Sequence, residues 1–260
     1  MSLGVLDPIL QRLDIFLLLF LRMMGLFATA PIWSNRLVPV QIRVALAMVT
    51  AVVVAPLFTA MAPVESLAAL VVLAVRELLV GMVIGFVAAL AFAAVQLAGQ
   101  LLDLNMGLSM VNLLDPMTNT QMPVMGNFLY ILAMLIFFTI NGHHMLLRAV
   151  MDSYALVPLG TASLSPNLAE TVANMGANLF LLGFKVAAPV LAAIFLTTIA
   201  LGVLNRAVPQ MNVFVIGMPV QLAVGIFMTM VFLPLYVSFL HMLFQGMSTD
   251  ILTLLRLLRE

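Results

Sequence analysis

LAALVVLAVRELLVGMVIGFVAALAFAAVQLAGQLL, residues 67–102, is an apolar run in which charge occurs only at Arg76 and Glu77. An apolar stretch this long is a candidate transmembrane helix. At ~1.5 Å per residue an unbroken helix would reach ~54 Å, whereas the hydrocarbon core of a bilayer is only ~30 Å thick. The stretch therefore predicts either two helical halves that bend back inside the protein or one helix that projects beyond the lipid.

The same apolar pattern recurs along the chain. The other apolar segments are residues 13–31, 44–61, 124–140, 175–204 and 213–244. Prolines occur within three of these segments, and a proline inside a helix removes a backbone hydrogen bond and kinks the helix. We therefore expect an all-α integral membrane protein with about six hydrophobic segments, several of them broken. Residues 1–260 are expected to form a single membrane-embedded helical domain.

Composition excludes several classes of protein. The chain has 260 residues, of which 65% are hydrophobic and 8% charged, whereas soluble domains carry about 25% charged residues. So few charged residues indicate that membrane lipid is a partner of the chain's surface. Because the net charge is zero, nucleic acid is not an expected partner. Because cysteine is absent, thiol catalysis and thiolate metal sites are excluded.

No motif in the sequence indicates catalysis or a cofactor. The chain contains no G-x-S-x-G element, P-loop or dinucleotide fingerprint, which are motifs that carry a known chemical mechanism. His143 and His144 are adjacent, so they do not lie on one helical face as two metal ligands would. We therefore expect neither an enzyme nor a metal or cofactor site.

Four charged residues are candidates for buried contacts: Arg76, Glu77, Lys185 and Arg206. Adjacent residues on a helix do not face each other, so Arg76 and Glu77 cannot pair with one another. A charge inside a membrane segment is a functional candidate by default. The alternatives are an ion pair with another segment or subunit, or a polar transport site. We interpret the four as buried charges at helix or subunit contacts.

Small residues form a regular series in the same segment. Gly81, Gly85, Ala89 and Ala93 recur every four residues, and GMVIG at 81–85 matches the GxxxG motif. Such a ridge lets the backbone of another helix approach closely. We therefore expect a close-packing ridge on this helix.

A more polar stretch, AGQLLDLNMGLSMVNLLDPMTNTQMP at residues 98–123, follows the long apolar run. If it is helical from Ala98, its side chains divide between two faces. The polar face would consist of Asn105, Ser109 and Asn112. The apolar face would consist of Met106, Met110 and Leu113.

Pro116 disfavours helical backbone at Asp115, so we expect this helix to end there and residues 117–123 to form a polar turn. An amphipathic piece this deep in a membrane protein needs a wet or adaptable surface to face. A lumen satisfies that need, and an ordinary interfacial loop is the alternative. We expect a central re-entrant segment at about residues 103–123.

Several motifs carry a resemblance to a known family. They are RELLVGMVIGF at 76–86, AGQLLDLNMGLSM at 98–110, Asp115-Pro116, Asn141-Gly142-His143 and, above all, LGVLNRAVPQMNVFVIGMP at 201–219. Together they resemble the FliR family of export-gate subunits of flagellar type III secretion, which is related to the T subunit of virulence injectisomes. The motifs are spread over most of the chain in the expected order.

The resemblance implies a non-enzymatic protein of the bacterial inner membrane and flagellar basal body. It implies assembly with FliP and FliQ into a helical hetero-oligomeric gate for unfolded protein substrates, with FlhB and FlhA-type subunits attached. It also implies kinked helical hairpins like a joined FliP and FliQ. A secondary transporter or ion channel with broken helices is the alternative, and a structural nucleus for FliP and FliQ without lumen contact is a third possibility.

In the FliR family a central loop plugs the closed channel, and the matching positions here are about residues 106–122. Methionine is flexible and adapts to changing contacts. The resemblance therefore implies a deformable seal around the exported chain. Its methionines would be Met106, Met110, Met117 and Met122, and Asn105, Ser109 and Asn112 would also line the plug.

Overall fold

The computed structural model describes residues 7–35, 37–58, 66–108, 123–163, 165–208, 210 and 212–259. Of the expected plug residues, Met106 and Asn105 fall within these ranges, whereas Ser109, Met110, Asn112, Met117 and Met122 lie outside them.

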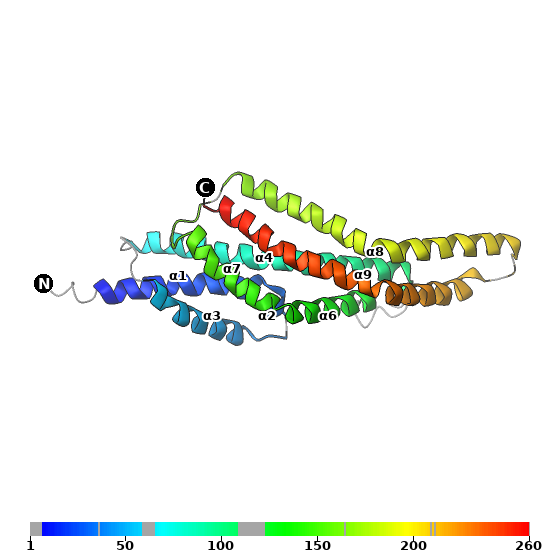
Figure 1. Ribbon diagram of the computed structural model, residues 1–260, viewed down its shortest axis with the longest axis horizontal. Coiled ribbons are helices and arrows are strands. Elements are labelled where there is room, and N and C mark those ends of the chain that lie inside the picture. The colour runs from blue at the N-terminus through cyan, green and yellow to red at the C-terminus, as the bar shows by residue number, and fades with distance from the viewer. Residues whose placement is uncertain are drawn as a thin grey trace. The chain divides into compact units, whose positions relative to one another are not determined.

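The described part of the chain is helical throughout its regular structure, which confirms the all-α class (Figure 1). The N-terminal helices are α1 (Asp7–Thr29), α2 (Pro31–Ser34) and α3 (Val40–Val54), which continues into the 3₁₀ turn η1 (Ala55–Leu57). The central helices are α4 (Leu67–Asn105), α6 (Val124–Thr139) and α7 (Gly142–Leu156). The C-terminal helices are α8 (Asn167–Ala207) and α9 (Val213–Leu257).

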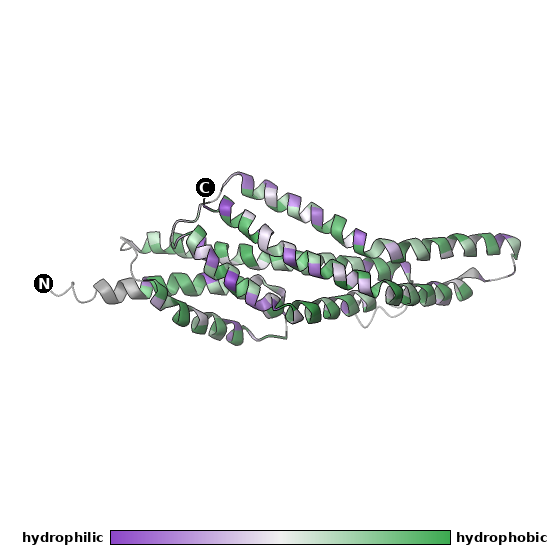
Figure 2. Ribbon diagram, in the orientation of Figure 1, coloured by the Kyte–Doolittle hydropathy of each residue, from purple (hydrophilic) through white to green (hydrophobic). Residues whose placement is uncertain are grey.

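Four stretches of the described residues are long and apolar enough to cross a membrane: Val40–Leu57, Leu67–Asn105, Asn167–Ala207 and Val215–Leu257. A fifth span results if α6 and α7, which are bent by 64° at their junction, count as one. Residues 13–31, the first of the six expected segments, are not among the spans found in the described residues. Figure 2 shows hydrophobic residues over most of α3 and α6, whereas α7 carries several hydrophilic ones.

Helix α4 is one unbroken helix of 39 residues, ~59 Å long at ~1.5 Å per residue. The expectation that this segment bends back as two halves is therefore wrong, and the alternative of one overlong helix holds. The expectation that the helix reaches Asp115 is also wrong, because α4 ends at Asn105. Gly107 has φ +78°, the left-handed conformation with which glycine commonly terminates a helix.

Two further boundaries differ from those expected. Helix α9 extends to Leu257, beyond the expected end of that segment at residue 244, and passes Pro219 and Pro234 without ending. Helix α7 lies in none of the six expected segments. Its buried residues Leu146, Val150, Ser153 and Tyr154 follow the helical spacing of an amphipathic helix.

The chain divides into two compact units: unit 1 comprises residues 1–90, 141–174 and 245–260, and unit 2 comprises 91–140 and 175–244. Helices α4, α8 and α9 contribute residues to both. The single domain expected over residues 1–260 stays a prediction. In unit 1, α1, α4 and α7 meet around fully buried residues such as Leu26, Ile84 and Leu146.

The core of unit 2 is aromatic. The rings of Phe92, Phe137 and Phe244, from α4, α6 and α9, pack with centroids 5.0–5.5 Å apart. In the same unit, the parts of α8 and α9 on either side of residues 208–212 run side by side (Figure 1), and Gln221 Nε2 donates a 3.0 Å hydrogen bond to Thr198 Oγ1 between them.

Candidate functional site

The end of α4 and the start of α6 are joined by Asp103. Its Oδ1 accepts a hydrogen bond from the Met125 amide and its Oδ2 one from the Gly126 amide, both at 2.9 Å. The first amides of a helix have no partner within that helix. Pro123, at the N-cap of α6, makes no side-chain cap hydrogen bond. Asp103 therefore supplies from α4 the acceptor that an N-cap side chain normally provides, and its charge suits a helix N-terminus.

The backbones of the two helices touch one turn earlier on α4. A Cβ placed on Gly99 would overlap the Cα of Gly126. A Cβ on Gly126 would lie 3.0 Å from the Cβ of Pro123 and 3.6 Å from Oδ2 of Asp103. Only a residue without a side chain fits at 99, and a Cβ at 126 would crowd Pro123, so the approach that lets Asp103 reach the α6 amides depends above all on Gly99.

Met106 lies at the end of α4 and is 1% exposed. Its side chain rests on Gly225 of α9, where a Cβ would come within 2.6 Å of its Cγ. Five residues thus hold α4, α6 and α9 together where the chain leaves α4 and enters α6. We call Gly99, Asp103, Met106, Gly126 and Gly225 the neck.

Two of the expected plug residues are thereby located. Met106 is part of the neck, whereas Asn105 is exposed and its Nδ2 donates a 2.8 Å hydrogen bond to the Leu101 carbonyl of its own helix. Because α4 ends at Asn105, the helical faces expected beyond it do not continue that helix. The lining role of both residues stays a prediction.

In unit 1, Glu77 is fully buried and pairs with Arg22 of α1 at 2.6 Å between Oε2 and Nε. Its other oxygen accepts a 2.8 Å hydrogen bond from the Gly160 amide. The partner that the sequence required for Glu77 thus comes from a different helix. Arg22 was not among the expected site residues, although a basic residue inside an apolar helix gives the same signal as Glu77.

Each nitrogen of the Arg22 guanidinium donates a hydrogen bond. It donates to Ser153 Oγ and to the Val157 carbonyl, each at 3.0 Å, and its carbon lies 4.3 Å from the centroid of the Tyr154 ring. A buried charge persists only when it is paired and hydrogen-bonded, as here. The arrangement is therefore a structural junction between α1, α4 and α7.

The other three expected charges, Arg76, Lys185 and Arg206, are exposed on the chain. Burial of these three at a subunit contact stays a prediction. Of the expected close-packing ridge on α4, the two glycines lie against α1. Gly81 and Gly85 face α1, where a Cβ would overlap the Arg22 carbonyl oxygen and the Thr29 hydroxyl, respectively, whereas Ala89 is half-buried and Ala93 is exposed.

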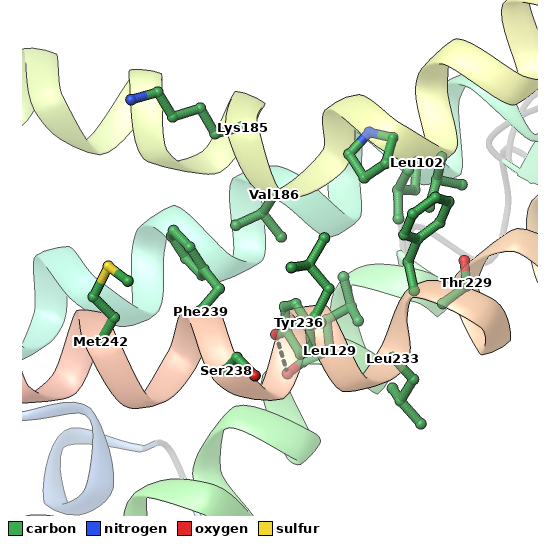
Figure 3. Close-up of a pocket in the computed structure, with 14 residues that line it drawn as sticks. Leu102, Leu129, Lys185, Val186, Thr229, Leu233, Tyr236, Ser238, Phe239 and Met242 are labelled. Carbon is green, nitrogen blue, oxygen red and sulfur yellow. Dashed lines mark hydrogen bonds between the residues drawn. The ribbon is translucent and has the colours of Figure 1, made fainter.

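A cavity of about 410 Å³ lies in unit 2 between α8 and α9 (Figure 3). It is bordered by Leu102 of α4 and Leu129 of α6, and Lys185 lies at its edge. The hydroxyls in its lining, on Thr229, Tyr236 and Ser238, each donate to a backbone carbonyl. The lining is otherwise largely apolar, so the cavity suits packing or hydrocarbon rather than acid–base chemistry.

These features define a class: a multi-pass, all-α membrane protein whose buried polar groups join helices to one another. Residues 13–247 match the family described as bacterial export proteins, family 1, and the chain belongs to that family.

Its similarity to individual members extends over most of the chain. It is 38% identical to flagellar biosynthetic protein FliR of Escherichia coli K12 over 91% of this chain and 90% of that protein. It is 35% identical to FliR of Bacillus subtilis 168 over 86% of this chain and 88% of that protein. It is 31% identical to Yop proteins translocation protein T of Yersinia pestis over 84% and 85%, respectively.

Family membership and the apolar helices together make the chain a structural subunit, not an enzyme, of the flagellar export apparatus. They identify it as a multi-pass inner-membrane protein of the flagellar basal body. The expected resemblance to the FliR family is therefore confirmed.

Proposed function

We propose that this chain assembles with FliP and FliQ into the flagellar type III export gate, with FlhB and FlhA-type subunits attached, and that the gate passes unfolded protein substrates. Similarity to FliR proteins along most of the chain supports this assignment. Similarity to a T protein that is named for protein translocation also supports it.

The length and surface of the C-terminal helices support assembly with other subunits. Helices α8 and α9 have 41 and 45 residues, so each is ~60 Å or longer and exceeds a bilayer core of ~30 Å. Only 22% and 11% of their most apolar windows are buried within the chain. Lipid cannot cover the whole of such helices. Large exposed apolar surfaces mark sites of protein interaction, so we propose that other subunits cover the parts of these helices that extend beyond the bilayer.

The connection between α4 and α6 is proposed to seal the closed channel. Its methionines would form a deformable collar around the exported chain, since methionine side chains repack easily. The seal would comprise Met106, Met110, Met117 and Met122, with Asn105, Ser109 and Asn112 lining it. Displacement of the connection would provide the open state. The observation that carries this proposal is the neck, where both ends of the connection are held at Asp103.

The rival function, secondary transport, depended on a shared site of buried charges. Both carboxylate oxygens of Glu77 are engaged by Arg22 and Gly160, and Arg76 and Lys185 are exposed. The charges on which that alternative rested therefore do not support a binding site within the described residues.

The test uses the full chain in its native membrane. A tagged chain purified from that membrane is expected to bring FliP and FliQ with it. Because the chain has no cysteine, a single introduced cysteine reports one position. Met117→Cys is expected to crosslink to a stalled export substrate, and Met242→Cys, on an exposed α9 residue, is not. Equal crosslinking at both positions, or small-solute transport by the purified chain alone, would contradict the proposal.

A further inference from the structure

Asp103 occupies a position that an ordinary helix cap does not explain. A helix is normally capped by its own N-cap side chain, and any serine or aspartate at 123 would perform that task locally. Instead, Pro123 supplies no acceptor, and the acceptor is a buried carboxylate on a different helix, 22 and 23 residues earlier in the chain. The α6 cap is therefore also a hydrogen-bonded link between α4 and α6.

That link determines where Met106 lies. Asp103 lies on the last turn of α4, and Met106 directly follows that turn, where its amide donates a 2.8 Å hydrogen bond to the Leu102 carbonyl. The Asp103 carboxylate fixes this turn against α6 on one side. The Met106 side chain, seated on Gly225, fixes it against α9 on the other.

We infer that Asp103 is a positioning residue for the channel seal: it ties the end of α4 to the start of α6 and thereby holds Met106 on Gly225. This inference rests on the proposed function, because the position of Met106 matters for export only if the connection seals a channel. Asp103 acts through Met106 and does not itself touch the exported chain.

The two hydrogen bonds of Asp103 determine which substitutions test this inference. A carboxylate accepts from both amides, whereas an asparagine in its place has one acceptor oxygen and turns an NH₂ donor toward the second amide. Asp103→Asn therefore removes one of the two hydrogen bonds and sets a donor against the second amide, which weakens the link with almost no change in volume. Pro123→Ser, added to Asp103→Asn, restores a local acceptor for α6 but leaves α4 untied. Comparison of the single variant with the double variant therefore separates the capping of α6 from the link between α4 and α6.

The first measurement reports the link itself. In the assembled export complex, a single cysteine in place of Met106 is labelled with a maleimide. Because Met106 is 1% exposed, labelling is expected to be slow in the parent, and Asp103→Asn is expected to raise its rate roughly tenfold, the change that loss of a hydrogen bond to a charged group produces. Pro123→Ser is not expected to reverse it. An unchanged rate in Asp103→Asn, or full reversal by Pro123→Ser, would overturn the inference.

The second measurement reports the seal. Ion leak through the assembled gate is expected to rise in Asp103→Asn while recovery of the complex stays at the parent level. Tyr236→Phe is the matched control: it removes one buried hydrogen bond from α9 to α6, at the Leu129 carbonyl, away from the neck. It is expected to leave both leak and Met106 labelling unchanged. Equal leak in the control and in Asp103→Asn would overturn the inference, because general loosening would then explain both.

The two readouts also separate the inference from the proposed function. A gate with a shortened connection serves as the positive control for leak. If it leaks and Asp103→Asn does not, the inference fails and the sealing function stands. If neither leaks although labelling at 106 rises in Asp103→Asn, the sealing function fails and the tether between α4 and α6 stands.

Discussion

Arg22 of α1 and Glu77 of α4 form a fully buried ion pair, 2.6 Å long and 55 residues apart in sequence. Each partner also bonds to groups after α7 or within it, namely the Gly160 amide and Ser153 Oγ. The pair therefore joins three helices of unit 1. Loss of either partner would leave the other charge buried without its counter-charge.

Glu77→Ala is expected to lower the free energy of unfolding by about 3–5 kcal/mol, because it leaves the Arg22 guanidinium buried without a counter-charge. Thermal unfolding of the full-length chain in detergent provides the measurement. Arg76→Ala is the control, since the adjacent Arg76 is exposed and surface substitutions usually change stability by no more than about 0.5 kcal/mol. Equal losses in the two variants would refute the role assigned to the pair.

Gly81→Ala and Gly202→Ala make the same substitution inside a helix with opposite expected results. Alanine gains about 1 kcal/mol over glycine in helix propensity. Nothing lies within 4 Å of a Cβ on Gly202, so that variant should be stabilised. A Cβ on Gly81 would overlap the Arg22 carbonyl oxygen, and overpacking of this kind costs about 1–3 kcal/mol. Melting temperatures that rise in both variants would show that α1 and α4 do not pack this closely.

Phe137→Ala is expected to destabilise the chain by about 3–5 kcal/mol, because Phe137 is fully buried against Phe92 and Phe244 and its loss leaves a cavity. Its neighbour Phe138 is 44% exposed, so Phe138→Ala should cost clearly less. Urea unfolding of the two full-length variants compares them. A larger loss for Phe138→Ala would mean that the opposite face of α6 is buried.

The fold class followed from the sequence because apolar length and the scarcity of charge determine it almost alone. The boundaries followed less well. The effect of Pro116 predicts that α4 ends near Asp115, but Gly107 adopts a left-handed conformation first and α4 ends at Asn105. The sequence does not predict helix α7, because its polar residues obscure the periodic buried face from Leu146 to Tyr154.

The contacts of the site were less predictable than its location. The sequence indicated that Glu77 needed a partner, yet only tertiary structure brings Arg22 to it across 55 residues. Asp103 carried no sequence signal beyond being an acid in an apolar region. Its role depends on Pro123 lacking an acceptor, which the sequence shows, and on the approach of Gly99 to Gly126, which a single sequence does not reveal.

The most direct test of the sealing function is passive ion flux through assembled gates whose four proposed seal methionines are replaced together by glycine. The variant combines Met106→Gly, Met110→Gly, Met117→Gly and Met122→Gly. A control gate carries Met230→Gly with Met242→Gly, two exposed methionines of α9. With equal amounts of assembled complex, the account predicts that ion flux rises in the seal variant and stays at the parent level in the control. Background flux in an assembled seal variant would contradict it.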